Sequence, residues 1–248
     1  MSPTPVAGPH AQPGSSSLCH EGYWWHRART GLLDAVMSPH LAAPRRTLDV
    51  GSADAPSVDW LRGAQQHVSL DLFPEGLRPG EGVVGSATEL PFADATFDVV
   101  SAFDVVEHCA DDARAVAELV RVLAPGGRML LSVPAYQWAW SDHDVRAGHH
   151  RRYTRPELVD LVEGAGTRVL RATYAFAGVF PLFAAERLGR RVRPARSGEA
   201  RLPQFSPVVD RALTGVCRAE ARVLHRHDLP FGSSVLVAAV RPQAPARS

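Results

Sequence analysis

Short apolar segments alternate with segments of helical periodicity along most of the chain. Four apolar runs have the length of a strand and are bounded by glycine or polar residues, at 46–50, 67–71, 82–86 and 97–102. Residues 111–123 place apolar side chains at helical spacing and stop at Pro125. The nearly continuous apolar run 128–133 is typical of a strand buried on both faces of a parallel sheet. This alternation predicts an α/β fold.

The other elements extend the same pattern. We expect helices at 21–37, 57–62, 154–165 and 208–225, and further strands at 169–176 and 233–240. Thr154 and Glu157 have the spacing of a capping box, which marks the start of the third of these helices. Together the segments predict a doubly wound, seven-stranded, mostly parallel sheet with right-handed crossovers.

The chain is organised as a single domain in this interpretation, over residues 19–241. Residues 1–18 are rich in Pro, Gly and Ser and are expected to form a disordered tail, and 242–248 a flexible one. Residues 135–153 are dense in Trp, His, Asp and Arg and are expected to form a long substrate loop. A helical insertion is expected at about 177–227.

Composition narrows the possible chemistry. The 27 basic residues are all arginine, which excludes a Schiff base to PLP, a P-loop lysine and a Ser-Lys dyad. The formal net charge of +1 gives no bulk electrostatic reason to bind nucleic acid. Three cysteines, far apart, form neither a disulfide framework nor a zinc-binding spacing. We therefore expect a cytoplasmic protein.

The predicted sheet places several residues at one edge. In such a sheet the ligand binds at the carboxyl ends of the strands, where Gly51, Asp71, Ser86 and Phe103 stand. A glycine in the first turn permits close approach of a ligand, and a carboxylate such as Asp71 suits a ribose diol. The alternative for Asp71 is an ordinary acid at a strand end. A dinucleotide fingerprint would need glycine at 53 and 56, where the chain has alanine and proline.

An ordered set of motifs resembles the class I S-adenosylmethionine-dependent methyltransferases. The set consists of Leu48-Asp49-Val50-Gly51, Asp71, the segment 85–92, the strand 97–100 leading to Glu107-His108, and the segment 118–128 before the fifth strand. Trp24-Trp25 and the loop from His143 to Tyr153 resemble a subgroup often found beside polysaccharide and glycosyl-transfer functions. Two alternatives remain: a lapsed methyltransferase fold, suggested by Ala53, Ala55 and Ser86, and an NAD(P)-dependent oxidoreductase.

The resemblance implies S-adenosylmethionine as cofactor and a set of residues that bind it. These are Asp49, Gly51, Ala53, Asp71, Leu72, Ser86, Ala87, Thr88, Phe103 and His108, with Arg29 on the amino-acid carboxylate. Arg29 could instead be a solvated helix arginine, and His108 a cap for the helix that follows. Trp24 and Trp25 are candidates to cover the cofactor, with one of them packed in the core.

The substrate loop supplies the candidate catalytic groups. A histidine can accept a proton near neutral pH, so His149 is the first candidate for general base and His143 the second, with Asp144 orienting one of them. Substrate contacts are expected from Trp138, Trp140, Arg151, Arg152 and Tyr153. The alternative is that Asp142 and Asp144 pair with the arginines and rigidify the loop. A metal on His143, Asp144 and His149 is a further alternative, but no metal is expected because the family chemistry needs none.

The expected acceptor is a small molecule or glycan-type compound, methylated on oxygen. Arginines 146, 151, 152 and 155 would suit an anionic acceptor. Residues 172–193 are apolar with a basic flank, a composition that can lie in a membrane interface and would suit a lipid-linked glycan acceptor, although packing within the protein is the preferred interpretation. The alternatives are packing over the sheet and a dimer contact, and Pro181 is expected to interrupt any long helix there.

Overall fold

A computed structural model describes residues 24–41, 43–51, 61, 64–74, 77, 82–192 and 206–243, with the side chains of 190–192 left out. Several expectations lie outside these residues. They are the tail 1–18, the turn with Ala53 and Ala55, most of the helix at 57–62, and most of the tail 242–248.

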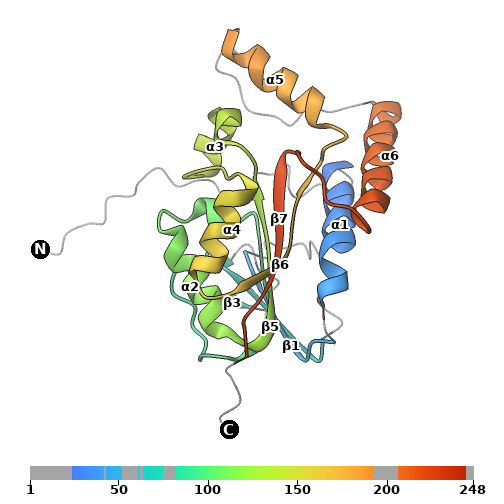
Figure 1. The fold of residues 1–248 in the computed structure, drawn as a ribbon. Coiled ribbons are helices and arrows are strands. Elements are labelled where there is room, and N and C mark those ends of the chain that lie inside the picture. Colours follow the sequence, from blue (N-terminus) through green and yellow to red (C-terminus); the bar gives the residue numbers. More distant parts are fainter. Residues whose placement is uncertain are drawn as a thin grey trace, which may run out of the picture.

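The predicted seven-stranded sheet is confirmed, in the order β3-β2-β1-β4-β5-β7-β6. The strands are β1 (Arg46–Val50), β2 (Gln66–Asp71), β3 (Val83–Val84), β4 (Phe97–Phe103), β5 (Leu123–Pro134), β6 (Arg168–Ala175) and β7 (Ser234–Val240). Strands β1 to β5 pair in parallel, and β7 lies antiparallel between β5 and β6. Six strands therefore end at one edge, the upper one in Figure 1, which we call the carboxyl edge.

Helices cover both faces of the sheet (Figure 1), with α1 and α6 on one and α2 and α4 on the other. The helices are α1 (Trp24–Met37), α2 (Asp112–Val122), α3 (Asp142–Ala147), α4 (Arg155–Gly164), α5 (Phe180–Val192) and α6 (Pro207–Leu224). The predicted capping box of α4 is present. The segment 135–153 differs from the expected loop, since it contains α3 and a short 3-10 helix, η5 (Gln137–Ala139).

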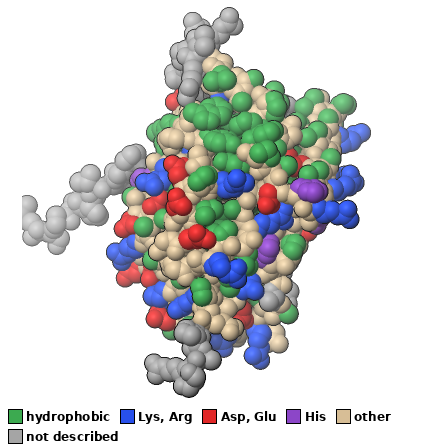
Figure 2. All heavy atoms as spheres, viewed as in Figure 1, with side chains coloured by type: hydrophobic (Ala, Val, Ile, Leu, Met, Phe, Trp, Pro, Cys, Tyr) green, Lys and Arg blue, Asp and Glu red, His purple; other side chains and the backbone are tan. Residues whose placement is uncertain are grey.

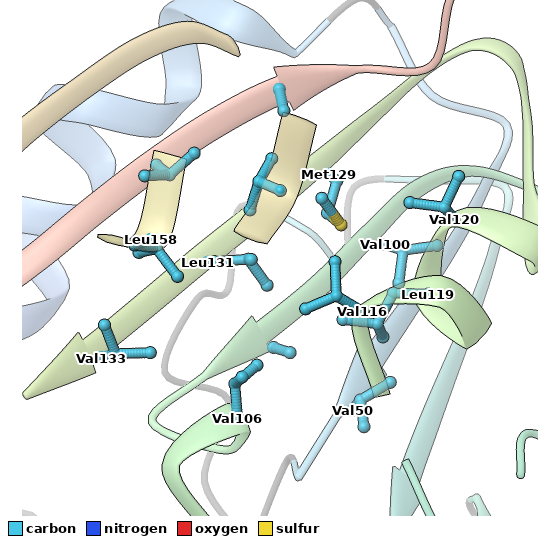
Figure 3. Packing of buried hydrophobic residues seen from close by; sticks show 14 of the residues in the cluster. Val50, Val100, Val106, Val116, Leu119, Val120, Met129, Leu131, Val133 and Leu158 are labelled. Atoms are coloured by element: carbon cyan, nitrogen blue, oxygen red, sulfur yellow. The ribbon is translucent and has the colours of Figure 1, made fainter. Parts of the chain in front are cut away.

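Strand β5 is apolar on both of its faces because helices cover both faces of the sheet. Met129 and Leu131 pack with the α2 and α4 side of the core, which Figure 3 shows, whereas Leu130 between them packs with the α1 and α6 side. Successive side chains of a strand point to opposite faces, so a strand covered on both sides must be apolar throughout. The sequence-based interpretation of this run is confirmed.

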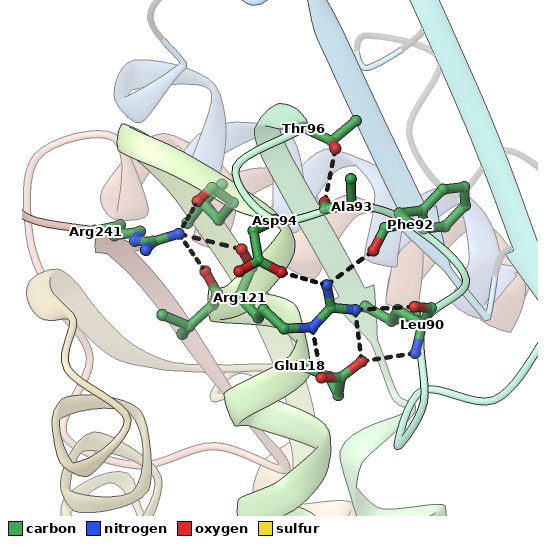
Figure 4. Close-up of polar contacts among 10 residues, drawn as sticks. Leu90, Phe92, Ala93, Asp94, Thr96, Glu118, Arg121 and Arg241 are labelled. Carbon is green, nitrogen blue, oxygen red and sulfur yellow. Dashed lines mark hydrogen bonds and ion pairs between the residues drawn. The ribbon is translucent and has the colours of Figure 1, made fainter.

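Arg121 fastens the segment after β3 to α2 (Figure 4). Its guanidinium donates to the carboxylates of Glu118 and Asp94 and to the carbonyl oxygens of Leu90 and Phe92. Glu118 in turn accepts the backbone N–H of Leu90. The network fixes the chain directly after residues 86–88, which are expected to contact the cofactor.

Candidate functional site

The first position of the turn after β1 requires a glycine. Gly51 has φ +70°, a conformation that favours glycine, and a Cβ there would overlap the side chain of Val105. Its backbone N–H donates to the carbonyl of Leu70 at 2.7 Å, which joins the ends of β1 and β2. The first turn therefore requires glycine for two separate reasons.

Two acids stand at the same end of β1 and β2. Asp49 is 3% exposed and accepts the hydroxyl of Ser101 at 2.6 Å. Asp71 ends β2, and one of its oxygens accepts the backbone N–H of Phe73 at 3.0 Å. Leu72, next to Asp71, is 58% exposed. The carboxyl edge thus carries Gly51 and Asp71 side by side on neighbouring strands, as the sequence predicts.

Residues 86–88 form a compact polar turn after β3. The hydroxyls of Ser86 and Thr88 lie 2.8 Å apart, and Ser86 Oγ also accepts the backbone N–H of Thr88. Arg114 on α2 donates to the carbonyl of Thr88 at 2.9 Å. Ala87 is half-buried between them. The segment is held in one shape at the edge of the sheet.

Helix α1 reaches the carboxyl edge through an arginine. Arg29 donates to the carboxylate of Asp104, which follows β4, with distances of 2.9 and 2.7 Å. Its guanidinium also lies over the rings of Trp25 and Phe103. The solvated alternative for Arg29 is wrong, and its contact with a cofactor carboxylate stays a prediction. Trp24, 9% exposed, is the tryptophan that packs in the core.

Asp144 and His149 form a hydrogen-bonded pair in the substrate loop. Oδ1 of Asp144 lies 2.9 Å from Nδ1 of His149, and Oδ2 accepts from Ser141. Burial opposes ionisation of Asp144, but hydrogen bonds from His149 and Arg152 outweigh it and hold the pKa of this carboxyl well below its usual range. An ionised carboxylate accepts the Nδ1–H of the imidazole, which assigns the lone pair to Nε2.

Glu107 and His108 face this pair from the short 3-10 helix η4 (Val106–His108) after β4. Glu107 is fully buried, and neither of its carboxylate oxygens has a hydrogen-bond partner. Burial, followed by the charge of Asp104, raises the pKa of Glu107 well above its usual range. The ring of His108 meets that of His149 edge to face, with centroids 4.6 Å apart.

The electrostatic surroundings of the two outer histidines favour their neutral forms. Partial burial of the ring and then the neighbouring His149 lower the pKa of His108 to about 4. Partial burial also lowers the pKa of His143, whose ring centroid lies 6.3 Å from that of His149. The capping alternative for His108 is wrong, because Asp111 caps α2 by accepting the backbone N–H of Arg114.

Two predicted substrate contacts belong to the protein framework instead. Arg152 is 7% exposed and donates to Asp144 and to the carbonyl of Ala135. Tyr153 is 2% exposed and donates to Asp112 at 2.9 Å. This corrects their assignment to the substrate, since their polar groups are turned inward and used. The loop-rigidifying alternative holds for Asp144 and Arg152.

The remaining arginines of the loop do not form one open cluster. Arg151 pairs with Asp112 at 2.9 Å, and Arg155 lies over the ring of Tyr174. With Arg152 buried, the expected anion-binding group of arginines 146, 151, 152 and 155 is not assembled in this structure. Asp142, the other acid of the alternative, is exposed.

Aromatic side chains form a layer at the start of the same loop. Tyr136 stacks on Trp138 and on Tyr174, with ring centroids 5.9 and 5.2 Å apart. Phe180 of α5 contacts both Tyr136 and Trp138. Trp140, further along the loop, is half-buried. These ring contacts join α5 and β6 to the start of the loop.

Sequence reasoning gave no role to Asp104, Glu107 and Asp112. A usable signal existed for Glu107, which stands beside a histidine in the segment that follows the predicted strand 97–102. Its complete burial has no counterpart in the local pattern, because burial depends on the loop 141–152 folding over it. The backbone N–H of His150 donates to the carbonyl of Glu107 at 2.7 Å, which shows that contact.

Comparison with known proteins decides the family. A family model described as a methyltransferase domain matches residues 48–131. A protein of Mycolicibacterium smegmatis, named a probable S-adenosylmethionine-dependent methyltransferase, is 31% identical over 191 residues, or 70% of this chain and 69% of that one. The chain belongs to the S-adenosylmethionine-dependent methyltransferases. The family assignment sets aside the oxidoreductase alternative.

Two further similarities concern a relative and a solved structure. The O-methyltransferase cnsE of Penicillium expansum is 26% identical over 185 residues, covering 62% of this chain and 66% of that protein. Phosphoethanolamine N-methyltransferase 2 of Haemonchus contortus, solved with S-adenosyl-L-methionine, shares the fold with a TM-score of 0.55. Its identity is 18%, with 88% of this chain and 53% of that one covered.

The described residues of this methyltransferase fit its cofactor. Gly51 follows β1 in a backbone conformation that favours glycine, and Asp71 offers a carboxylate at the end of the neighbouring strand, where a ribose diol is bound in sheets of this kind. Contacts from Ser86, Thr88 and Phe103 stay predictions, as does one from Ala53, which lies outside the described residues.

Replacing Asp71 by alanine is expected to weaken binding of S-adenosylmethionine by about 10- to 100-fold. A hydrogen bond to a charged group contributes about 1.5–3 kcal/mol, which corresponds to that range. Isothermal titration of the variant and of Asp160→Ala, which removes an exposed acid from α4, measures the effect. Equal affinities for the two folded variants would refute the role of Asp71.

Proposed function

We propose that this methyltransferase transfers the methyl group to an oxygen of a hydroxylated small molecule or glycan-type acceptor. The observation that carries the proposal is the Asp144–His149 pair at the carboxyl edge, 2.9 Å apart. An imidazole held by a buried carboxylate keeps a fixed orientation and a defined lone pair. The similarity to an O-methyltransferase supports the choice of oxygen.

In this mechanism, different residues of the chain bind the cofactor, orient the acceptor and accept the proton. When bound, the cofactor supplies a methyl group activated by a sulfonium. Gly51 and Asp71 hold it at the first two strands, and the aromatic layer of Tyr136 and Trp138 orients the acceptor. His149 receives the proton of the acceptor hydroxyl at Nε2, while Asp144 stabilises the imidazolium that forms. Most of the rate enhancement comes from alignment of the acceptor with the methyl group.

Transfer of a labelled methyl group tests the proposal. The full chain is incubated with methyl-labelled S-adenosylmethionine and two matched sets of acceptors, one with free hydroxyls and one with the same hydroxyls already methylated. Label is expected only in the first set, as an ether that survives mild alkali. Label on nitrogen, or equal labelling of both sets, would contradict O-methylation.

We further propose that the acceptor is carried on a lipid and that α5 rests on the membrane surface. Figure 2 shows hydrophobic side chains gathered at the upper end of the molecule, where α5 projects from the sheet. Leu182 and Leu188 of α5 are 60% and 51% exposed. Pro181 lies in the first turn of α5, where proline is tolerated, so it does not interrupt the helix. Among the described residues, no helix is both long and apolar enough to cross a membrane.

Sedimentation with vesicles checks this placement. The protein is expected to pellet with vesicles of anionic phospholipid at low salt and less at high salt. Leu182→Ser combined with Leu188→Ser should abolish pelleting without unfolding, because both side chains are exposed. Val223→Ser, an exposed apolar residue on α6, serves as the control. Wild-type protein that stays in the supernatant at low salt would mean that α5 contacts protein instead.

A further inference from the structure

Three side chains from two separate segments converge at the carboxyl edge. Glu107 and His108 belong to η4, and His149 follows α3, about 40 residues later in the chain. One carboxylate oxygen and one ring nitrogen from each histidine lie within 4.8 Å of one another. Donor atoms bound to one ion at about 2.1 Å with tetrahedral geometry are about 3.4 Å apart, so small side-chain movements bring all three to a shared ion.

The carboxyl group of Glu107 has no hydrogen-bond partner outside its own residue in the described structure. It is fully buried, and both oxygens lack a hydrogen-bond partner. A buried polar group without a partner is costly, and a cation is the partner that satisfies a carboxylate most strongly. Glu107 is therefore an independent sign that something binds here.

Each of the two histidines has a hydrogen-bond partner outside the cluster. His149 donates from Nδ1 to the carboxylate of Asp144, and His108 makes a hydrogen bond with the backbone of Ala147. Metal-binding histidines in proteins almost always donate their second ring N–H to a carboxylate or a backbone carbonyl, which directs the other nitrogen at the ion. The hydrogen bond between Asp144 and His149 has this arrangement.

We propose that Glu107, His108 and His149 bind one divalent transition-metal ion of the zinc class. Two imidazoles and a carboxylate form a borderline ligand set that suits Zn²⁺, and three protein ligands leave a further position open. The set differs from the sequence-based alternative, because Asp144 supports His149 from behind and His143 takes no part.

An ion at this place bears on the proposed O-methylation. An acceptor hydroxyl at the open position would have its pKa lowered by the ion, which takes over the role of the imidazole lone pair. The two roles of His149 exclude each other at any moment, because a lone pair that holds a metal does not accept a proton. This consequence rests on the proposed function, whereas the binding of the ion does not.

Calorimetric titration of the chelator-treated full chain with Zn²⁺, without cofactor or acceptor, tests the site. One ion per chain is expected to bind. Glu107→Gln and His108→Ala should each weaken binding by at least about 100-fold, and Asp144→Asn by about 10- to 100-fold through loss of orientation. His108 is exposed, so its removal leaves the fold intact.

His150→Ala is the matched control, since this exposed histidine neighbours the site without belonging to it. Binding equal to that of the wild type is expected for it. The chain has 11 histidines. Binding unaffected by Glu107→Gln and His108→Ala would therefore place the zinc on other surface groups and overturn the proposal, as would no binding at all. Because no acceptor is present, these outcomes leave the proposed methyl transfer to its own test.

Discussion

His149→Ala is expected to lower the rate of methyl transfer by about 10²–10⁴-fold and to leave the affinity for S-adenosylmethionine near that of the wild type. The factor is the usual contribution of a positioned acid or base. Affinity is preserved because His149 lies in the substrate loop, while Gly51 and Asp71 stand at β1 and β2. Single-turnover measurement with a hydroxylated acceptor, combined with cofactor titration, gives both quantities.

His150→Ala is the control for this experiment as well, because its ring is exposed and only its backbone contacts Glu107. If His149→Ala lowers the rate of methyl transfer by only a few-fold, His149 positions the acceptor and is not the general base. If His143→Ala shows the large loss instead, the proton goes to His143 and the Asp144–His149 pair is structural.

Asp144→Ala is expected to lower the free energy of unfolding by about 3–5 kcal/mol, because it leaves the buried guanidinium of Arg152 without its carboxylate. For a domain of this size each kcal/mol corresponds to roughly 2–4 °C in Tm, so melting should fall by about 10 °C. Asp142→Ala removes an exposed acid from the same helix and should cost below about 1 kcal/mol. Calorimetric melting of both variants checks the difference.

The carboxylate of Asp144 also makes the stability of the fold fall at acidic pH. The folded-state pKa of Asp144 is depressed, so its contribution is present above the ordinary value of about 3.9 and is lost as the pH falls below it. Wild type and Asp144→Ala should therefore converge in Tm in strongly acidic buffer. If Tm plotted against pH stays parallel for the two proteins from pH 6 to pH 3, the carboxylate does not stabilise the fold through its charge.

The fold could be predicted from the sequence because its signals are local. Each strand is an apolar run, and the box of Thr154 and Glu157 starts α4. The short helix α3 is not predicted from the sequence, because six residues are too few to show a helical pattern of apolar positions. Ser141 and Asp144 nevertheless form a capping box at its start. The interruption expected at Pro181 was wrong because α5 begins one residue earlier, at Phe180.

The candidate site could be predicted only in part, because its contacts are long-range. Gly51 and Asp71 follow directly from the ends of predicted strands. The pairing of Arg29 with Asp104 joins α1 to β4, and no local pattern reveals which carboxylate an arginine reaches. Burial of Arg152 and Tyr153 likewise depends on how the loop folds back on β5, and the local sequence does not distinguish a buried polar side chain from one that contacts a substrate.

The position of β7 has a consequence for biosynthesis. Residues 234–240 fill the gap between β5 and β6, and Ser233 accepts the backbone N–H of Ala135 where the substrate loop begins. A nascent chain therefore has two unpaired strand edges in mid-sheet until residues 234–240 have been made. Unpaired strand edges promote aggregation, and insertion of β7 between β5 and β6 removes both of them. Premature termination before residue 234 leaves neither a closed sheet nor an anchored loop.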